Sequence, residues 1–239
     1  MDVCSRISPW LLGLLLQAAR MGCAEGAAHE RLSRHADDSV TFSLDTLPGT
    51  NFSNLIWRSS SRGPIHVVAA WEAGNIVDVL NANYARRVTF HEESWSLEIH
   101  NLTKEDGGFY EAVELQGDSE VLLKQYTLFV FDFSVEESKS VNGSCILRLR
   151  CEAGVGAGNK VTYSWTSGGV ETQGSGLHLT LRPADKNQLA ICGAVAAEAH
   201  QEFSIFPFKY CPVGSRAAGL LAPPSLGILL LLLLLLPRL

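Results

Sequence analysis

The stretch LEIHNLTKEDGGFY, residues 97–110, decides the fold of this chain. Leu97 and Ile99 alternate with polar neighbours, and a period of two is typical of a strand that buries one face. Leu102 follows where it can pack under the turn that ends this strand, and Tyr110 begins the next strand. The stretch therefore predicts two β-strands joined by a short polar connection.

The same stretch resembles immunoglobulin variable-type domains in its spacing Leu-x-Ile-x-x-Leu-x-x-x-Asp-x-Gly-x-Tyr. In that fold, a tyrosine at the position of Tyr110 bonds back to upstream backbone and forms a tyrosine corner. The resemblance implies that Asp106 pairs with an arginine of an earlier strand, for which Arg87 is the candidate. It also implies that Trp57 is the tryptophan buried in the core.

The inter-sheet disulfide of this domain type is missing from the first half. Ala112 stands two residues after Tyr110, and Phe42 stands at the matching position of the earlier strand. Large Phe42 opposite small Ala112 can fill the volume of the missing cystine, because protein cores are close-packed. The domain gives up roughly 2–5 kcal/mol of disulfide stabilisation.

The rest of the first half consists of short apolar runs separated by turn residues, with no long helical period. Such a pattern is typical of an all-β sandwich. The expected strands are 40–44, 55–57, 65–71, 76–80, 87–90, 97–102, 109–115 and 126–130.

The second half has cysteines that the first half lacks. Cys145 and Cys151 recur with the intervening leucines at a period of two, so they share one strand face. Four cysteines allow three disulfide connectivities. The order Cys151, Trp165, Cys192 resembles the immunoglobulin core, which implies a Cys151–Cys192 bridge between sheets and Cys145–Cys211 as a second clamp. The last strand is expected over 202–210.

Both ends of the sequence resemble processing signals. Residues 1–24 combine Arg6 with a short apolar run and small residues before position 25, as in a cleaved signal peptide. Small residues around Ser215, a spacer and the run Leu226–Leu236 are typical of a glycosylphosphatidylinositol (GPI) attachment signal. We expect lipid attachment at Ser215 and removal of 216–239.

With the two terminal signals set aside, the sequence predicts two tandem immunoglobulin-like β-sandwiches. The first is a variable-type domain without a disulfide over 25–131, and the second is a constant-type (C2-type) domain with two disulfides over 132–213. Sequons at Asn51, Asn101 and Asn142 agree with passage through the secretory pathway.

Composition argues against several other functions. The chain has 19 basic and 25 acidic residues, a net charge of −6, and no basic cluster that could neutralise phosphates. Its 7 histidines show no metal-ligand spacing. The glycine-rich run 154–160 lacks the Gly-Lys-Ser/Thr ending of a phosphate-binding loop. We expect no enzymatic activity, cofactor, metal, nucleic acid or small-molecule substrate.

A variable-type domain without a disulfide, followed by a short constant-type domain with two, resembles the SLAM (signalling lymphocytic activation molecule) family of leukocyte receptors. The most specific shared motif is C-x-L-x-L-x-C at Cys145–Cys151, and the span Val40–Trp57 also fits. Within the family, the chain is most similar to the short GPI-anchored lymphocyte-activation-marker member. The resemblance implies an adhesion ligand that modulates immune-cell activation by binding a SLAM-family receptor on another leukocyte. It implies contact through the sheet formed by strands G, F, C, C′ and C″ of the first domain.

Strand alternation selects the residues of that sheet that should face outward. With Trp57, Tyr110 and Tyr126 inward, their neighbours point out and form a mixed-charge patch with little apolar area. The expected partner-binding residues are Arg58, His66, Glu111, Val113, Asp118, Glu120, Gln125 and Thr127. Asn51 and Asn101 should lie on strand connections, away from the sheet. The alternative is an ordinary solvated sheet.

Two other interpretations stay open. One is a single-span transmembrane receptor of the same superfamily, in which Leu220–Leu236 crosses the membrane although Pro223 and Pro224 interrupt it. The other is a pathogen-encoded mimic that acts as a decoy ligand.

Overall fold

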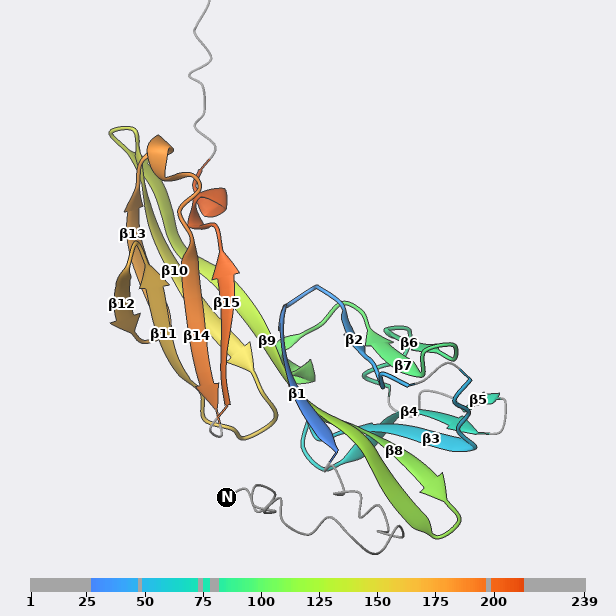
Figure 1. The fold of residues 1–239 in the computed structure, drawn as a ribbon. Helices are drawn as coiled ribbons and strands as arrows, with labels where there is room; N and C mark the ends of the chain where they lie inside the picture. Colours follow the sequence, from blue (N-terminus) through green and yellow to red (C-terminus); the bar gives the residue numbers. More distant parts are fainter. Residues whose placement is uncertain (1–26, 47–48, 73–74, 78–81, 197–198, 213–239) are drawn as a thin grey trace, which may run out of the picture.

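The computed structural model describes residues 27–46, 49–72, 75–77, 82–196 and 199–212. Two β-sandwiches follow one another along the chain, and the long strand β9 (Ser119–Val141) passes from the first into the second (Figure 1). The expected all-β class with two immunoglobulin-like sandwiches is confirmed. The predicted signal peptide, Ser215 and the segment 216–239 lie outside the described residues.

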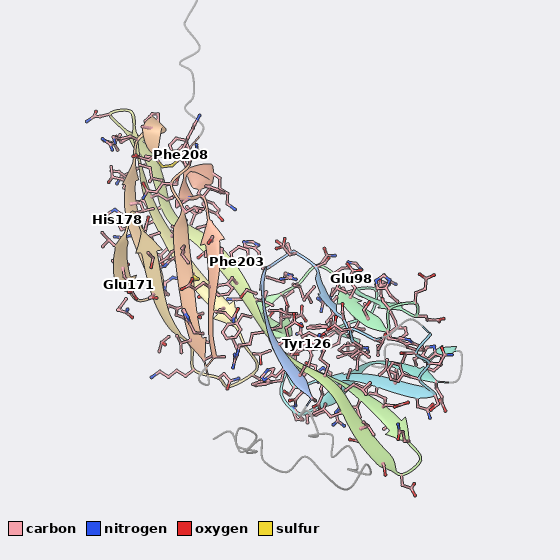
Figure 2. All side chains as sticks on the ribbon, in the orientation of Figure 1. Glu98, Tyr126, Glu171, His178, Phe203 and Phe208 are labelled. Atoms are coloured by element: carbon pink, nitrogen blue, oxygen red, sulfur yellow. A yellow bond between two sulfur atoms is a disulfide. The ribbon has the colours of Figure 1, made fainter. Side chains whose placement is uncertain are left out.

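The first sandwich has two layers. In one, the strands follow the order β9-β8-β3-β4-β5, and β1 runs parallel to β9. In the other, the order is β2-β7-β6. Tyr126 on β9 and Glu98 on β7 mark the two layers in Figure 2. The bounds are β1 Ala28–His35, β2 Val40–Phe42, β3 Asn54–Ser59, β4 His66–Glu72, β5 Asn75–Val77, β6 Val88–His91, β7 Ser96–Ile99, the 3₁₀ helix η1 Lys104–Asp106 and β8 Gly108–Gln116.

The second sandwich uses the remainder of β9. One layer has the order β13-β10-β9, so both sandwiches share a continuous sheet, and the other has the order β12-β11-β14-β15. The bounds are β10 Ser144–Gly154, β11 Thr162–Ser167, β12 Val170–Gln173, β13 Gly176–Leu181, η2 Pro183–Asp185, β14 Ala190–Ala196, β15 Ala199–Ile205 and η3 Pro207–Tyr210. The expected boundary after residue 131 falls inside β9.

Aromatic rings occupy the centre of the first core. The ring of Phe42 stacks on Tyr110 at a centroid distance of 4.5 Å and meets Tyr126 edge-on at 5.0 Å. Trp57 and Ala112 are fully buried. Phe42 therefore packs where a disulfide would stand in a typical variable-type domain, as the sequence predicts.

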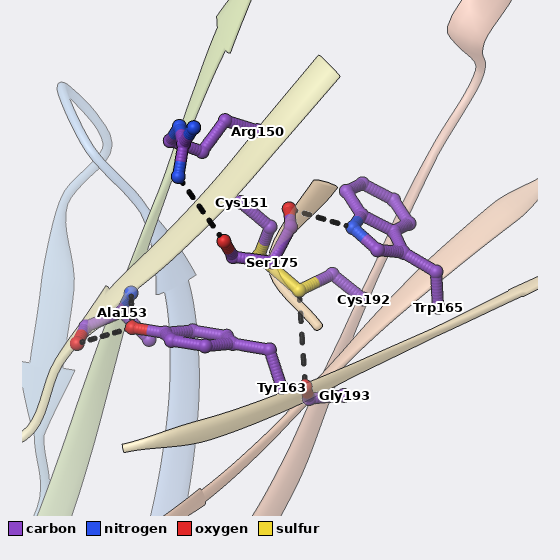
Figure 3. Close-up of a disulfide and its surroundings, with 8 residues drawn as sticks. All are labelled: Arg150, Cys151, Ala153, Tyr163, Trp165, Ser175, Cys192 and Gly193. Carbon is purple, nitrogen blue, oxygen red and sulfur yellow. Dashed lines mark hydrogen bonds between the residues drawn. A yellow bond between two sulfur atoms is a disulfide. The ribbon is translucent and has the colours of Figure 1, made fainter. Parts of the chain in front are cut away.

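The two disulfides of the described residues both lie in the second sandwich. Cys151–Cys192 joins the layers beside Trp165, whose indole N–H donates to the carbonyl of Ser175 at 2.9 Å (Figure 3). Cys145–Cys211 ties β10 to the chain just after η3. Both pairings agree with the sequence prediction.

One strand prediction in this sandwich is wrong at its end. The last strand was expected over 202–210, but β15 ends at Ile205, and η3 begins at Pro207. Proline has no N–H for a ladder bond and fixes its own φ, so the strand cannot continue.

The two sandwiches contact each other through backbone atoms at two glycines. A Cβ added to Gly154 would lie 1.7 Å from the carbonyl oxygen of Lys104, and one added to Gly107 would lie 1.9 Å from that of Gly154. Ala157 N–H donates to the Ser61 carbonyl at 2.9 Å, and Lys104 pairs with Glu152. This joint also borders a groove of about 590 Å³.

Candidate interaction face

An ion-paired triad lies on the outward face of the first sandwich. Arg58 and Glu111 are directly opposite on β3 and β8, and Arg58 Nε donates to Glu111 Oε1 at 2.5 Å. Arg58 Nη1 also donates to Glu120 Oε2 at 2.9 Å. Burial acts to lower the pKa of Arg58, but the two carboxylates outweigh it, so its pKa lies above the usual value. The structure thus brings together three of the expected binding residues.

An apolar row crosses the same face beside the triad. In the strand register, Ile56 lies opposite Ala70 on one side and Val113 on the other, and Val113 lies opposite Leu122. Glu111 stands on one side of this row, and Glu120, opposite Leu115, stands on the other. Arg58 contacts both carboxylates.

That arrangement corrects the expectation that Val113 is exposed. Val113 points outward, as alternation predicts, but only 1% of it is accessible to solvent. Ile56 and Leu122 flank it in the strand register. The apolar row also corrects the expectation of a face with little apolar area.

The expected exposure of Thr127 is wrong as well, since only 1% of it is accessible. β1 pairs in parallel with β9 and places Arg31 opposite Thr127, while Phe109 lies opposite it on β8. The His29 imidazole also contacts the Thr127 hydroxyl at 2.8 Å. An N-terminal strand that the sequence analysis did not predict therefore covers this residue.

The remaining expected binding residues lie in different places. Gln125 is half-buried beside Glu111, and Asp118 is exposed in the β8–β9 turn. His66 lies opposite buried Ser59, and its ring stacks on fully buried Tyr84 at 5.7 Å. His66 is therefore turned away from the triad.

A shallow hollow of about 220 Å³ lies next to the triad at the end of β3. Its lining includes Ile65, Phe109 and Gln125, and Ile65 and Phe109 are 65% and 43% exposed. Sequence reasoning missed both apolar side chains. Phe109 could have been found, because it alternates with inward Tyr110 and lies in the same strand as Glu111.

Asp106, the last residue of η1 in the first sandwich, is fully buried. Arg87 Nη1 donates to its Oδ2 at 2.7 Å, as expected, and Arg62 Nη2 donates to its Oδ1 at 2.8 Å. The Tyr110 hydroxyl donates to the Asp106 carbonyl at 2.5 Å, which is the tyrosine corner. Burial acts to raise the pKa of Asp106, but the two guanidinium groups outweigh it and hold that pKa below its usual value. Arg62 is a partner that sequence reasoning did not identify.

The three sequon asparagines are exposed and lie on strand connections. Asn51 stands between β2 and β3, Asn101 between β7 and β8, and Asn142 between β9 and β10. None lies on the strands that form the outward face.

Comparison with known proteins finds relatives in the SLAM family. No family model matches the chain. It is 33% identical to human T-lymphocyte surface antigen Ly-9 over 168 residues, which is 65% of the chain and 25% of that protein. It is 26% identical to human SLAM family member 5 over 237 residues, which is 94% of the chain and 68% of that protein.

The chain is therefore similar to SLAM-family proteins. It spans only a quarter of the length of Ly-9. Among solved structures, the CD2-binding domain of CD58 is similar, with a TM-score of 0.37, 17% identity and coverage of 77% of this chain and 99% of that one.

The similarity to SLAM-family proteins agrees with the expectation that the chain is not an enzyme. In the part of the chain that the structure describes, no helix is both long and apolar enough to cross a membrane. Within the same residues, no three His, Cys, Asp or Glu side chains are grouped so that they could hold a metal ion.

Proposed function

We propose that this chain is a SLAM-family cell-surface adhesion ligand that is held in the outer leaflet of the plasma membrane by GPI. It binds a SLAM-family receptor on another leukocyte through the outward face of β4, β3, β8 and β9 and so modulates immune-cell activation. The observation that carries this proposal is the triad of Arg58, Glu111 and Glu120, because ordered charges on the face of a sheet suit selective contact between proteins.

The glycan positions support this face as the contact surface. A glycan is bulky, and Asn51, Asn101 and Asn142 all lie on turns. A partner can therefore approach the strands themselves.

A binding screen tests the proposal. The protein purified from mammalian cells is passed over immobilised ectodomains of Ly-9, SLAM family member 5 and CD2. We expect at least one to bind with fast dissociation, and Glu111→Lys to abolish that binding. Glu171→Lys is the matched control, because Glu171 is also an exposed strand carboxylate but lies on β12 in the second sandwich (Figure 2).

The melting temperature separates loss of binding from loss of folding. Glu111 is partly exposed, and exposed ion pairs contribute about 0–1 kcal/mol, so Glu111→Lys should melt nearly as the wild type does. Normal binding by Glu111→Lys, together with loss from Glu171→Lys, would move the contact to the second sandwich.

The anchor has its own test. Phosphatidylinositol-specific phospholipase C should release the protein from the cell surface. Retention after complete digestion would favour the transmembrane alternative, which the run Leu220–Leu236 keeps open.

A further inference from the structure

The charges of the outward face are already paired within the chain. Arg58 is held by Glu111 and Glu120, so it is not free to be the main attraction for a partner. The triad still carries one more carboxylate than cations, and exposed Asp118 in the adjacent turn adds another negative charge. The charge on this face that is not paired within the chain is therefore negative.

Charged contacts of this kind steer association more than they supply affinity. Affinity in protein interfaces concentrates in a few packed anchors near the centre. On this face the side chains in that position are Ile56 and Leu122, which stand on either side of Val113 in the strand register. Leu122 is a large apolar residue that is 39% exposed, on a part of β9 that, among the described strands, pairs only with β8.

Arg58 orders the charges around these two positions. Its guanidinium group is held by Glu111 and Glu120, which stand on either side of the apolar row in the strand register. The apolar row is therefore bordered by side chains that are fixed by ion pairs. A pre-ordered surface of this kind loses little conformational entropy when a partner binds.

We propose that Ile56 and Leu122 are the anchors that give this face its affinity, and that the partner presents an apolar side chain bordered by Lys or Arg. The apolar side chain packs on the row, and the basic side chains complement the unshared carboxylate oxygens of Glu111 and Glu120. This inference rests on the proposed function, because it takes the same face as the contact surface.

Kinetic measurements test the two halves of the inference separately. The probes are the Ly-9 and SLAM family member 5 ectodomains, and the protein is the full chain purified from mammalian cells. Leu122→Ser and Ile56→Thr should each raise Kd about tenfold, mainly through faster dissociation. Leu122→Met conserves volume and should bind within about twofold of the wild type. Val170→Ser is the control, because Val170 is 63% exposed on a strand of the second sandwich.

The charge of the partner is tested by salt and by Glu120→Gln. Raising ionic strength should slow association of the wild type, and Glu120→Gln should reduce both the association rate and its salt dependence. Faster association in high salt would overturn a basic partner surface.

The outcomes distinguish this inference from the proposed function on which it rests. Thermal melts first show that Leu122→Ser and Ile56→Thr are folded. If both variants then bind as the wild type does while Glu111→Lys loses binding, the outward face is the contact surface but Ile56 and Leu122 are not its anchors. If Glu111→Lys also binds normally, both are wrong. Failure of every probe to bind the wild type would overturn both as well.

Discussion

Asp106 shows how one residue fixes the first sandwich. It is a fully buried carboxylate, and such a group is tolerated only when it is paired. Arg87 and Arg62 supply the charges, and its own backbone carbonyl accepts the Tyr110 hydroxyl. The residue therefore links the β3–β4 turn, the chain before β6 and the start of β8.

Replacing Asp106 by Asn keeps its shape but removes the charge. We expect Asp106→Asn to lower the free energy of unfolding by about 2–4 kcal/mol, because two arginines lose their buried partner. Urea denaturation followed by tryptophan fluorescence measures this loss. Asp185→Asn is the control, because Asp185 is a carboxylate that lies outside the core and caps a 3₁₀ helix in the second sandwich. An unchanged midpoint for Asp106→Asn would contradict the account.

The same carboxylate predicts an acid sensitivity. Its pKa in the folded protein is lowered, so its contribution is fully present above the unfolded value of about 4. The contribution is lost as pH falls through the lower folded value. Thermal melts from pH 6 down to pH 2 should show stability falling below about pH 4. Asp106→Asn should show a smaller slope in that range, and an equal slope in both proteins would contradict this assignment.

Residue spacing was sufficient to predict the inside of the molecule but not its surface. The burial of Trp57, Tyr110 and Cys151 was expected from strand alternation together with the resemblance to immunoglobulin domains, because burial on a strand depends on local alternation. Val113 is buried between Ile56 and Leu122 of the neighbouring strands, and Thr127 is covered by β1. Both burials are set by contacts between residues far apart in sequence, which alternation within one strand does not contain.

At the scale of elements, β9 and β10 join the two sandwiches. β9 pairs with β8 in the first sandwich and with β10 in the second. Gly154, the last residue of β10, meets the carbonyl of Lys104 in η1. The sequence analysis treated residues around 131 as a boundary, since an apolar period gives no sign of which sheet each half of a strand joins.

Gly154→Ala tests this joint. The added Cβ would lie 1.7 Å from backbone, so η1 and β10 must separate. We expect a loss of about 1–3 kcal/mol and a changed distance between spin labels placed on the two sandwiches. Gly176→Ala on β13 is the control, because a Cβ there meets nothing within 4 Å. Unchanged distances and stability in Gly154→Ala would contradict the packing of the joint.

The disulfides offer a second test at this scale. Replacing Cys151 and Cys192 by alanine removes a fully buried bridge beside Trp165 and should cost about 2–5 kcal/mol. The Cys145–Cys211 bridge is nearer the surface, so its double alanine variant should lose less, because it leaves a smaller core cavity. Calorimetry of the two variants compares them directly. A larger loss from the outer pair would contradict this order.

At the scale of the whole molecule, the two sandwiches differ in how their exposed residues are arranged. The outward face of the first sandwich combines charge pairs with an apolar row, whereas the exposed apolar residues of the second are divided among its strands and turns. The sequence indicated which sheet to examine only through its resemblance to a family. Alternation identified Arg58 and Glu111, but the row through Ile56 required the register between four strands.

Hydroxyl-radical footprinting of the wild-type complex with its receptor tests the central claim most directly, because it needs no substitution. Ile56, Phe109 and Leu122 should each lose reactivity when the receptor ectodomain binds. Val170, Leu189 and Phe206, which are exposed apolar residues of the second sandwich, should keep theirs. Protection of the second group with no change in the first would contradict adhesion through the outward face of the first sandwich.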